Sequence, residues 1–160
     1  PYSSRQALRY NMIEQLKWNN TPIEDKGVAQ FAPNASIKDY PEIDLFGYMK
    51  TAKKKDENGN TFKRNAVVRL SHAIGLEAYK GDMDYLTNMG LSNRGKGLDN
   101  SIAMSEIQKS FYTYTISIDL DLVGIDANDN TNLSAEERAK RVCDFLSAVE
   151  FLYRDIKGKI

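Results

Sequence analysis

The sequence has 160 residues, 41% of them hydrophobic and 28% charged, and its 22 basic and 22 acidic residues leave a formal net charge of zero. This composition is ordinary for a globular protein and excludes a nucleic-acid binder that relies on overall charge, although affinity for phosphate depends on where the cations sit. No apolar run approaches the roughly 20 residues that span a bilayer, and no secretory signal opens the chain. We therefore expect a cytoplasmic protein without a membrane segment.

The chain contains one cysteine, Cys143, and one histidine, His72. A lone cysteine cannot form an internal disulfide, and these two residues cannot build a zinc site without several further ligands. A catalytic Cys–His pair is formally possible. However, Cys143 falls in a helical pattern and His72 at a strand end, which favours a small buried hydrophobe and a structural histidine. We predict no metal and no cofactor.

The first predicted element is a helix over residues 3–17, where apolar residues recur every four positions and Ser3 and Gln6 have the spacing of a capping box. Residues 18–43 follow and hold three of the four prolines. This stretch predicts a long irregular connection, and connections of that length inside a compact domain are often functional or inserted.

The middle of the chain predicts two strands and a second long loop. Residues 44–52 predict the first strand, and Asn58-Gly59 is a strong hairpin signal. The second strand is predicted over 61–71, where apolar and polar residues alternate. Residues 80–105 hold four of the ten glycines and predict a loop.

The last third predicts a strand and a helix. Residues 111–123 predict the strand: from Tyr112 to Leu122 apolar and polar side chains alternate strictly, which is typical of a half-buried strand in an antiparallel sheet. Residues 135–157 carry an apolar stripe at helical spacing, and Ser134 and Glu137 form a second capping box.

The order of these elements predicts an α+β fold, with helices on one face of an antiparallel sheet. A ferredoxin-like sheet would need one more strand before Pro1 and another after Ile160. Because the chain also begins without methionine, we expect a sequence shortened at both ends. We expect one domain over 1–160. Its main elements are predicted at about 3–17, 44–71 and 111–157, and its insertions at about 18–43 and 80–105.

A basic hairpin is the first candidate binding feature. Seven cations between residues 50 and 69 are opposed by Asp56 and Glu57 alone. On two short strands and a turn they would form a positive prong able to follow a phosphate backbone. The alternative is a solvated edge hairpin whose lysines prevent edge-to-edge pairing. The seven cations are Lys50, Lys53, Lys54, Lys55, Lys63, Arg64 and Arg69.

The start of the first helix is the second candidate. Its opening residues are Ser3, Ser4, Arg5 and Gln6, with Arg9 one turn later. Hydroxyls and free backbone N–H groups at a helix N-terminus bind phosphate well, and the two arginines would add charge. Simple capping is the alternative, and both interpretations can hold together.

Acidic residues near the end of the chain allow two further hypotheses. Residues 126–137 imitate the ligand order of a calcium loop, but Thr131 stands where the turn needs glycine, which favours a polar turn that caps the next helix. The second hypothesis is a metal-dependent nuclease, although no histidine or lysine base lies nearby in the sequence. Its cluster would be Asp119, Asp121, Asp126 and Asp129.

Four segments are long and unusual enough to carry a family resemblance: PYSSRQALRY, LSHAIGLEAYKGDMDYLTNMGL, EIQKSFYTYTISIDL and FLYRDIKG. Through them nearly the whole chain resembles the DevR-type backbone subunit of type I-B CRISPR effector complexes (Cascade). The resemblance implies a modified RNA-recognition-motif palm with inserted finger and thumb-like loops. It also implies a non-enzymatic protein that coats CRISPR guide RNA in a filament of its own copies, joins other Cascade subunits and presents the guide to target DNA.

The resemblance further implies which residues contact RNA. The helix opening is similar to one that contacts the RNA backbone in this superfamily, the hairpin 53–64 matches the finger region, and the loop 88–97 resembles a loop near the guide. A metal-dependent RNase using the Asp119–Asp129 cluster and a protein-interaction domain that binds no nucleic acid stay open as alternatives. The implied RNA contacts are Ser4, Arg5, Gln6, Arg9, Lys53, Lys54, Lys55, Lys63, Arg64, Asn88 and Arg94.

Overall fold

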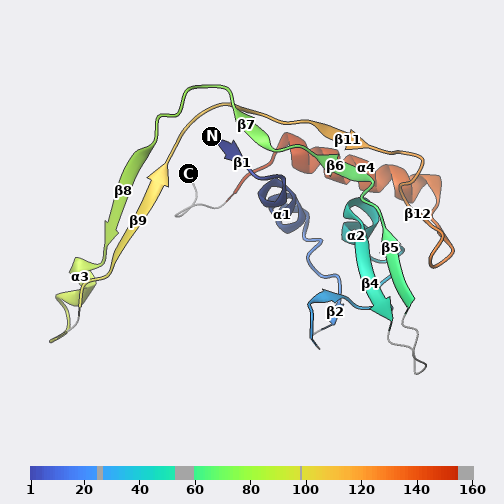
Figure 1. Ribbon diagram of the computed structural model, residues 1–160, viewed down its shortest axis with the longest axis horizontal. Coiled ribbons are helices and arrows are strands. Elements are labelled where there is room, and N and C mark those ends of the chain that lie inside the picture. Colours follow the sequence, from blue (N-terminus) through green and yellow to red (C-terminus); the bar gives the residue numbers. More distant parts are fainter. Residues whose placement is uncertain (25–26, 53–59, 98, 155–160) are drawn as a thin grey trace. The chain divides into compact units, whose positions relative to one another are not determined.

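The structure, a computed structural model, describes residues 1–24, 27–52, 60–97 and 99–154 (Figure 1). The chain separates into two compact units, which we call the hairpin unit and the main unit. The hairpin unit comprises Pro1–Tyr2 and Ala73–Tyr114, and the main unit comprises Ser3–His72 and Thr115–Ile160. Among the described residues, no helix combines the length and the apolar character needed to cross a membrane.

The described residues form a mixed α/β structure with small antiparallel sheets, which confirms the predicted α+β class. The helices are α1 (Arg5–Leu16), α2 (Pro41–Phe46), α3 (Met89–Ser92) and α4 (Ala135–Glu150). The strands are β1 (Tyr2–Ser3), β2 (Ile23–Glu24), β3 (Gln30–Phe31), β4 (Tyr48–Ala52), β5 (Asn60–Arg64), β6 (Val68–Leu70), β7 (Ala73–Gly75), β8 (Asp82–Thr87), β9 (Ile102–Ile107), β10 (Tyr112–Thr113), β11 (Ile116–Ile118), β12 (Ile125–Asp126) and β13 (Thr131–Asn132). They pair as β1–β7–β10, β6–β11, β12–β13, β2–β3, β4–β5 and β8–β9.

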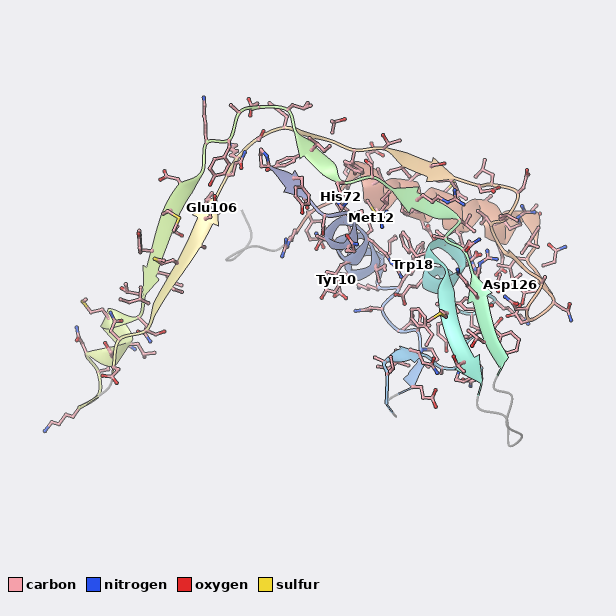
Figure 2. All side chains as sticks on the ribbon, in the orientation of Figure 1. Tyr10, Met12, Trp18, His72, Glu106 and Asp126 are labelled. Carbon is pink, nitrogen blue, oxygen red and sulfur yellow. The ribbon has the colours of Figure 1, made fainter. Side chains whose placement is uncertain are left out.

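The core of the main unit lies where its helices meet. Helix α1 packs against α4, and Met12 of α1 is fully buried (Figure 2). Phe46, at the end of α2, meets Phe145 of α4 edge to face, with ring centroids 6.0 Å apart. Such aromatic pairs stabilise a core beyond the area that they bury, so the positions of α1, α2 and α4 within this unit are fixed together.

Helix α1 begins at Arg5, two residues later than the helix predicted over 3–17. Its capping residue is Ser4, whose Oγ accepts a hydrogen bond from the N–H of Ala7 at 3.1 Å. The predicted cap, Ser3, belongs instead to the extended strand β1, so the capping box of Ser3 and Gln6 does not form. The helix ends at Leu16. The next residue, Lys17, caps it with a left-handed backbone (φ 57°), and its N–H donates to the carbonyl of Glu14.

Residues 44–46 form a helix, so the strand predicted over 44–52 is wrong in its first part. Pro41 occupies the start of α2, where its fixed φ suits a helix, and Glu42 and Asp44 lie in the positively polarised first turn. The helix stops at Gly47, which has φ +74° and lies so close to β5 that a Cβ there would be 2.5 Å from the carbonyl oxygen of Arg64. Strand β4 starts only after this turn.

The strand predicted over 61–71 divides into β5 and β6. Between them Val67 is buried, as is its neighbour Val68, so the alternation expected of one continuous strand over 61–71 is interrupted here. The N–H of Val67 donates to the carbonyl of Leu45 at 3.0 Å, and its own carbonyl accepts from the N–H of Asp119 at 3.1 Å. These backbone partners come from distant segments, so the local alternation of side chains could not reveal the break.

The long strand predicted over 111–123 is also shorter than expected. Only β10 and β11 are extended, and the chain turns after Ile118. Leu120 and Leu122 lie in that turn and are exposed, although the pattern predicted both on a buried face. Strand β11 pairs with β6 so that Ser117 lies opposite Arg69.

Helix α4 begins at the predicted cap and ends early. The Oγ of Ser134 accepts from the N–H of Glu137 at 3.3 Å, which confirms the start. The helix was predicted to reach residue 157 but ends at Glu150, because the side-chain amide of Gln15 takes up the following backbone: it donates to the Phe151 carbonyl at 3.1 Å and accepts from the Tyr153 N–H at 3.2 Å. Cys143 lies on α4 as predicted but is exposed rather than buried.

The hairpin unit contains two six-residue strands where the sequence predicted a loop over 80–105. Strands β8 and β9 pair antiparallel from Asp82 opposite Ile107 to Thr87 opposite Ile102. The glycines and asparagines that suggested a loop are concentrated between these strands and around α3. One face of the hairpin carries four exposed apolar side chains, Met83, Tyr85, Ile102 and Met104, beside Thr87 and Glu106.

Candidate nucleic-acid interface

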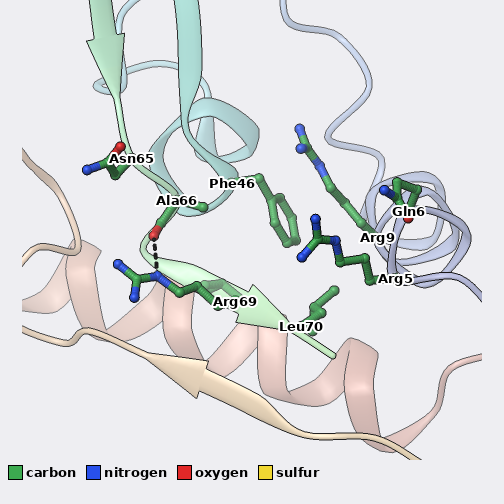
Figure 3. A pocket seen from close by; sticks show the side chains of 9 residues that line it. Arg5, Gln6, Arg9, Phe46, Asn65, Ala66, Arg69 and Leu70 are labelled. Carbon is green, nitrogen blue, oxygen red and sulfur yellow. Dashed lines mark hydrogen bonds between the residues drawn. The ribbon is translucent and has the colours of Figure 1, made fainter. Parts of the chain in front are cut away.

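An open pocket of about 630 Å³ in the main unit brings the start of α1 together with the end of α2 and with β6 (Figure 3). Three of the predicted RNA contacts, Arg5, Gln6 and Arg9, line it. Figure 3 shows the side chain of Arg5 reaching from α1 into the space beside Phe46, while Arg69 enters from β6. The remaining lining residues are Phe46, Asn65, Ala66, Val68, Arg69 and Leu70.

The three arginines of the pocket are not equivalent. Arg9 lies over the ring of Phe46, 4.9 Å from its centroid, and 4.0 Å from the carboxylate of Glu42. Burial lowers the pKa of Arg9 and Glu42 counteracts part of that shift, but a guanidinium stays charged in proteins. Within the described ranges neither Arg5 nor Arg69 forms an ion pair; Arg69 donates a 3.5 Å hydrogen bond from Nε to the Ala66 carbonyl. Their charge is therefore available to an anion.

The backbone of the first helical turn adds one donor. A helix leaves its first N–H groups without intrahelical partners. Here Ser4 accepts from the N–H of Ala7, and the Nδ1 atom of His72 accepts from the N–H of Arg5 at 3.1 Å. No described residue accepts from the N–H of Gln6. This N–H and the guanidinium groups of Arg5 and Arg69 thus provide donors of the kinds that hold a phosphate group.

The predicted basic hairpin is divided between the surface and the core. In β4 and β5 Met49 and Lys63 lie opposite each other and are exposed, whereas the next residues along each strand, Lys50 and Arg64, point to the other face. Because successive side chains of a strand alternate between faces, a run of cations cannot all reach solvent. Lys53, Lys54 and Lys55 lie outside the described residues.

Arg64, which the sequence predicted as an RNA contact, is bound inside the protein. Its guanidinium lies 2.7 Å from Asp44, donates to the Leu122 carbonyl at 2.8 Å and also donates to the Ile125 carbonyl. Its side chain is 8% exposed. We therefore assign Arg64 a structural role instead of a surface one.

Lys50 is also buried. Its ammonium group donates to the carbonyl of Ala35 and lies 4.3 Å from the centroid of the Tyr48 ring. Burial lowers the pKa of Lys50, against the opposing effect of Asp129 and Asp126. This lysine contributes no charge to an outer face of the hairpin.

The two predicted contacts of the 88–97 loop belong to the hairpin unit. Asn88 precedes α3, and its side-chain oxygen accepts from the N–H of Ser101 at 2.6 Å, which closes the connection between β8 and β9. Arg94 is exposed beyond α3. The structure thus gives Asn88 a local structural contact and leaves Arg94 on the surface.

The aspartates of the nuclease hypothesis do not converge. Asp119 and Asp121 are exposed, whereas Asp126 is buried and accepts from the hydroxyl of Tyr48 at 2.6 Å; burial and that bond raise the pKa of Tyr48. Burial alone would raise the pKa of Asp129, but hydrogen bonds from Ser36 and Thr131 outweigh it and lower the pKa. Among the described residues, no three His, Cys, Asp or Glu side chains are grouped so as to hold a metal ion.

Sequence reasoning missed part of the pocket. Asn65 and Phe46 gave no signal, because each comes from a segment distant from α1 and neither belongs to a motif. Arg69 was noticed only as one of the hairpin cations. Arg69 stands between the apolar residues Val68 and Leu70, whereas Arg64 follows Lys63 and precedes Asn65. That local alternation is a sequence signal that places Arg69 on the solvent-facing side of its strand, as observed.

Comparison with known proteins identifies a family. The model of a family described as CRISPR-associated negative auto-regulator DevR/Csa2 matches residues 1–159. No curated protein sequence matches the chain. The family match covers all the segments that carried the resemblance in the sequence, and it covers both units of the structure. The chain therefore belongs to the DevR/Csa2 family of CRISPR-associated proteins.

Proposed function

We propose that this chain is a guide-RNA-binding backbone subunit of a type I-B CRISPR surveillance complex. In this role it is a non-enzymatic cytoplasmic protein with a ferredoxin-like, RNA-recognition-motif palm. It coats the guide RNA in a filament of its own copies, contacts other Cascade subunits and meets target DNA through the guide. Membership of a CRISPR-associated family supports the general role, and the arginine pocket supports the binding of RNA.

The observation that carries the proposal is the set of donors around the start of α1. Arg5, Arg69 and the N–H of Gln6 lie around an open pocket. Among the described residues, no carboxylate forms an ion pair with Arg5 or Arg69. Guanidinium groups and backbone N–H groups recognise phosphate oxygens and carry no information about the base. A protein that must accept guides of any sequence needs this kind of contact.

Further contacts extend the proposed RNA path beyond the pocket. Ser4, which caps α1, and Arg9, which stacks on Phe46, complete the helix opening. Lys63 is exposed on β5, and we include Lys53, Lys54 and Lys55 with it as proposed contacts. Asn88 and Arg94 of the hairpin unit remain proposed contacts as well.

Charge reversal in the pocket tests the proposal. We expect the double variant Arg5→Glu/Arg69→Glu to bind a fluorescein-labelled, mixed-sequence single-stranded RNA at least about tenfold more weakly at 0.1 M salt, measured by anisotropy. Two lost phosphate contacts should also make the slope of log affinity against log salt shallower by about 1.4.

The matched control is Lys38→Glu/Lys140→Glu, which changes the net charge equally at two exposed positions outside the pocket. We expect this control to retain most of the affinity and the wild-type salt slope. Equal losses in both double variants would show that the pocket is not the site. An unmodified chain that binds no RNA would refute the proposed function itself.

A further inference from the structure

His72 ties the end of the β6 segment to the start of α1. Its Nδ1 atom accepts the backbone N–H of Arg5 at 3.1 Å, although the two residues are 67 positions apart. Figure 2 shows His72 beside α1. Arg5 and Leu70, which lies two residues before His72, both line the arginine pocket. The hydrogen bond therefore joins the two sides of that pocket, one formed by α1 and the other by β6.

The bond also decides which backbone donor remains for a ligand. The N–H of Ala7 goes to Ser4 Oγ and the N–H of Leu8 to the Ser4 carbonyl. With the N–H of Arg5 taken by His72, the donor of the first turn without a described acceptor is that of Gln6. A ligand anion at this helix start would therefore meet one backbone donor and the side chains of Arg5 and Arg69.

We infer that His72 is a positioning residue for a phosphodiester group in the arginine pocket. By accepting from Arg5 it holds the first turn of α1 against β6, so that Arg5 and Arg69 can meet the same anion and Gln6 can donate to it. The inference rests on the proposed function for its natural ligand, RNA. It does not rest on RNA for its chemistry, because any small phosphate anion would meet the same donors.

The chemistry of the ring sets the condition for this role. A neutral imidazole that accepts at Nδ1 carries its proton on Nε2, and a doubly protonated ring has no acceptor left. A glutamine side chain offers an acceptor oxygen without a titrating group, whereas alanine offers none. Replacing His72 by alanine would leave the N–H of Arg5 without this partner and would remove the link between α1 and β6.

The experiment compares the full chain with its His72→Ala and His72→Gln variants. Each protein is titrated with inorganic phosphate while the backbone amide signals of Arg5 and Gln6 are followed by NMR, and each is then titrated with labelled RNA. We expect His72→Ala to bind phosphate about fivefold more weakly, which corresponds to one hydrogen bond, and His72→Gln to recover most of the loss. Melting temperatures of all three proteins show whether the variants are folded.

The possible outcomes separate the inference from the proposed function. Equal phosphate affinity in the wild type and His72→Ala, or no phosphate-dependent shift at Gln6, would overturn the role of His72. If phosphate binding depends on His72 but RNA does not bind, the inference stands and the proposed function fails. If His72→Ala does not fold, the ring nitrogens of the wild type decide: a proton on Nδ1 of the neutral ring would overturn the inference.

Discussion

At the scale of single residues, Asp44 is the charge on which the main unit depends. Its carboxylate is fully buried, lies 2.7 Å from Arg64 and 2.8 Å from Arg141, and accepts from the N–H of Gly124. Arg141 in turn donates to the Ile37 carbonyl at 2.6 Å. One carboxylate is therefore shared by two buried cations, and those cations donate hydrogen bonds to carbonyl groups from several segments. A buried pair of this kind is most costly when only one partner is removed.

We expect the substitution Asp44→Asn to lower the free energy of unfolding by about 3–5 kcal/mol, because it leaves Arg64 and Arg141 buried without their counter-charge. Urea unfolding followed by circular dichroism measures the change. The control Asp121→Asn alters an exposed aspartate and should stay within about 0.5 kcal/mol of the wild type. A loss below about 1 kcal/mol for Asp44→Asn would mean that water or another group compensates the two arginines.

At the scale of elements, the sequence correctly predicted those boundaries that depend only on a few neighbouring residues. Ser134 and Glu137 could be identified as the start of α4 because the cap involves only adjacent residues. The end of α4 could not be predicted, because it depends on Gln15 of a distant helix. The loop predicted over 80–105 was wrong because its composition was weighed above the short alternating runs that became β8 and β9.

The start of α1 offers a direct test of one such correction. Removal of a capping side chain costs about 1 kcal/mol of stability. We expect that cost for Ser4→Ala, whose hydroxyl accepts from Ala7, and almost none for Ser3→Ala, which changes a residue of β1. Thermal unfolding of the two variants in parallel gives the comparison. If Ser3→Ala were the more damaging substitution, the capping box indicated by the sequence would be the correct description.

At the scale of the whole molecule, the two units differ in how well they can stabilise themselves. The main unit buries large side chains such as Met12, Ile43 and Phe145 completely. Strands β8 and β9 of the hairpin unit have an exposed apolar face, on which Tyr85 is 62% and Ile102 65% exposed. An isolated two-stranded hairpin is marginally stable in water.

We therefore expect the backbone amides of β8 and β9 to exchange with deuterium much faster than those of α4 in the free chain, because local opening is easiest where few apolar contacts are buried. Hydrogen–deuterium exchange with mass spectrometry measures both segments in one experiment. Strand pair β4–β5 serves as the internal control, since it is also a hairpin but packs Tyr48 and Phe62 against a core. Equal protection of the two hairpins would show that the apolar face is covered in solution.

The difference between local patterns and long-range packing also explains how much of the site could be predicted from the sequence. Arg5, Gln6 and Arg9 could be predicted because they share one helix start, and the structure brings all three to the pocket. Arg69 and Phe46 reach the pocket through the packing of β6 and α2, which no local pattern encodes. Arg64 was predicted on the exposed face of the hairpin but lies on the buried face, for a related reason. Successive side chains of a strand point to opposite faces, and the charge of one residue does not tell which face is buried.

The exposure of Cys143 on α4 has a practical consequence for counting molecules. It is the only thiol of the sequence, and it borders a shallow groove with Leu120 and Val142. A maleimide dye would therefore mark each copy once without any substitution, and the number of bleaching steps in a single particle would report how many copies that particle contains. The same fact helps to interpret a non-reducing gel: since this chain has no second thiol, any disulfide that it forms joins it to another molecule.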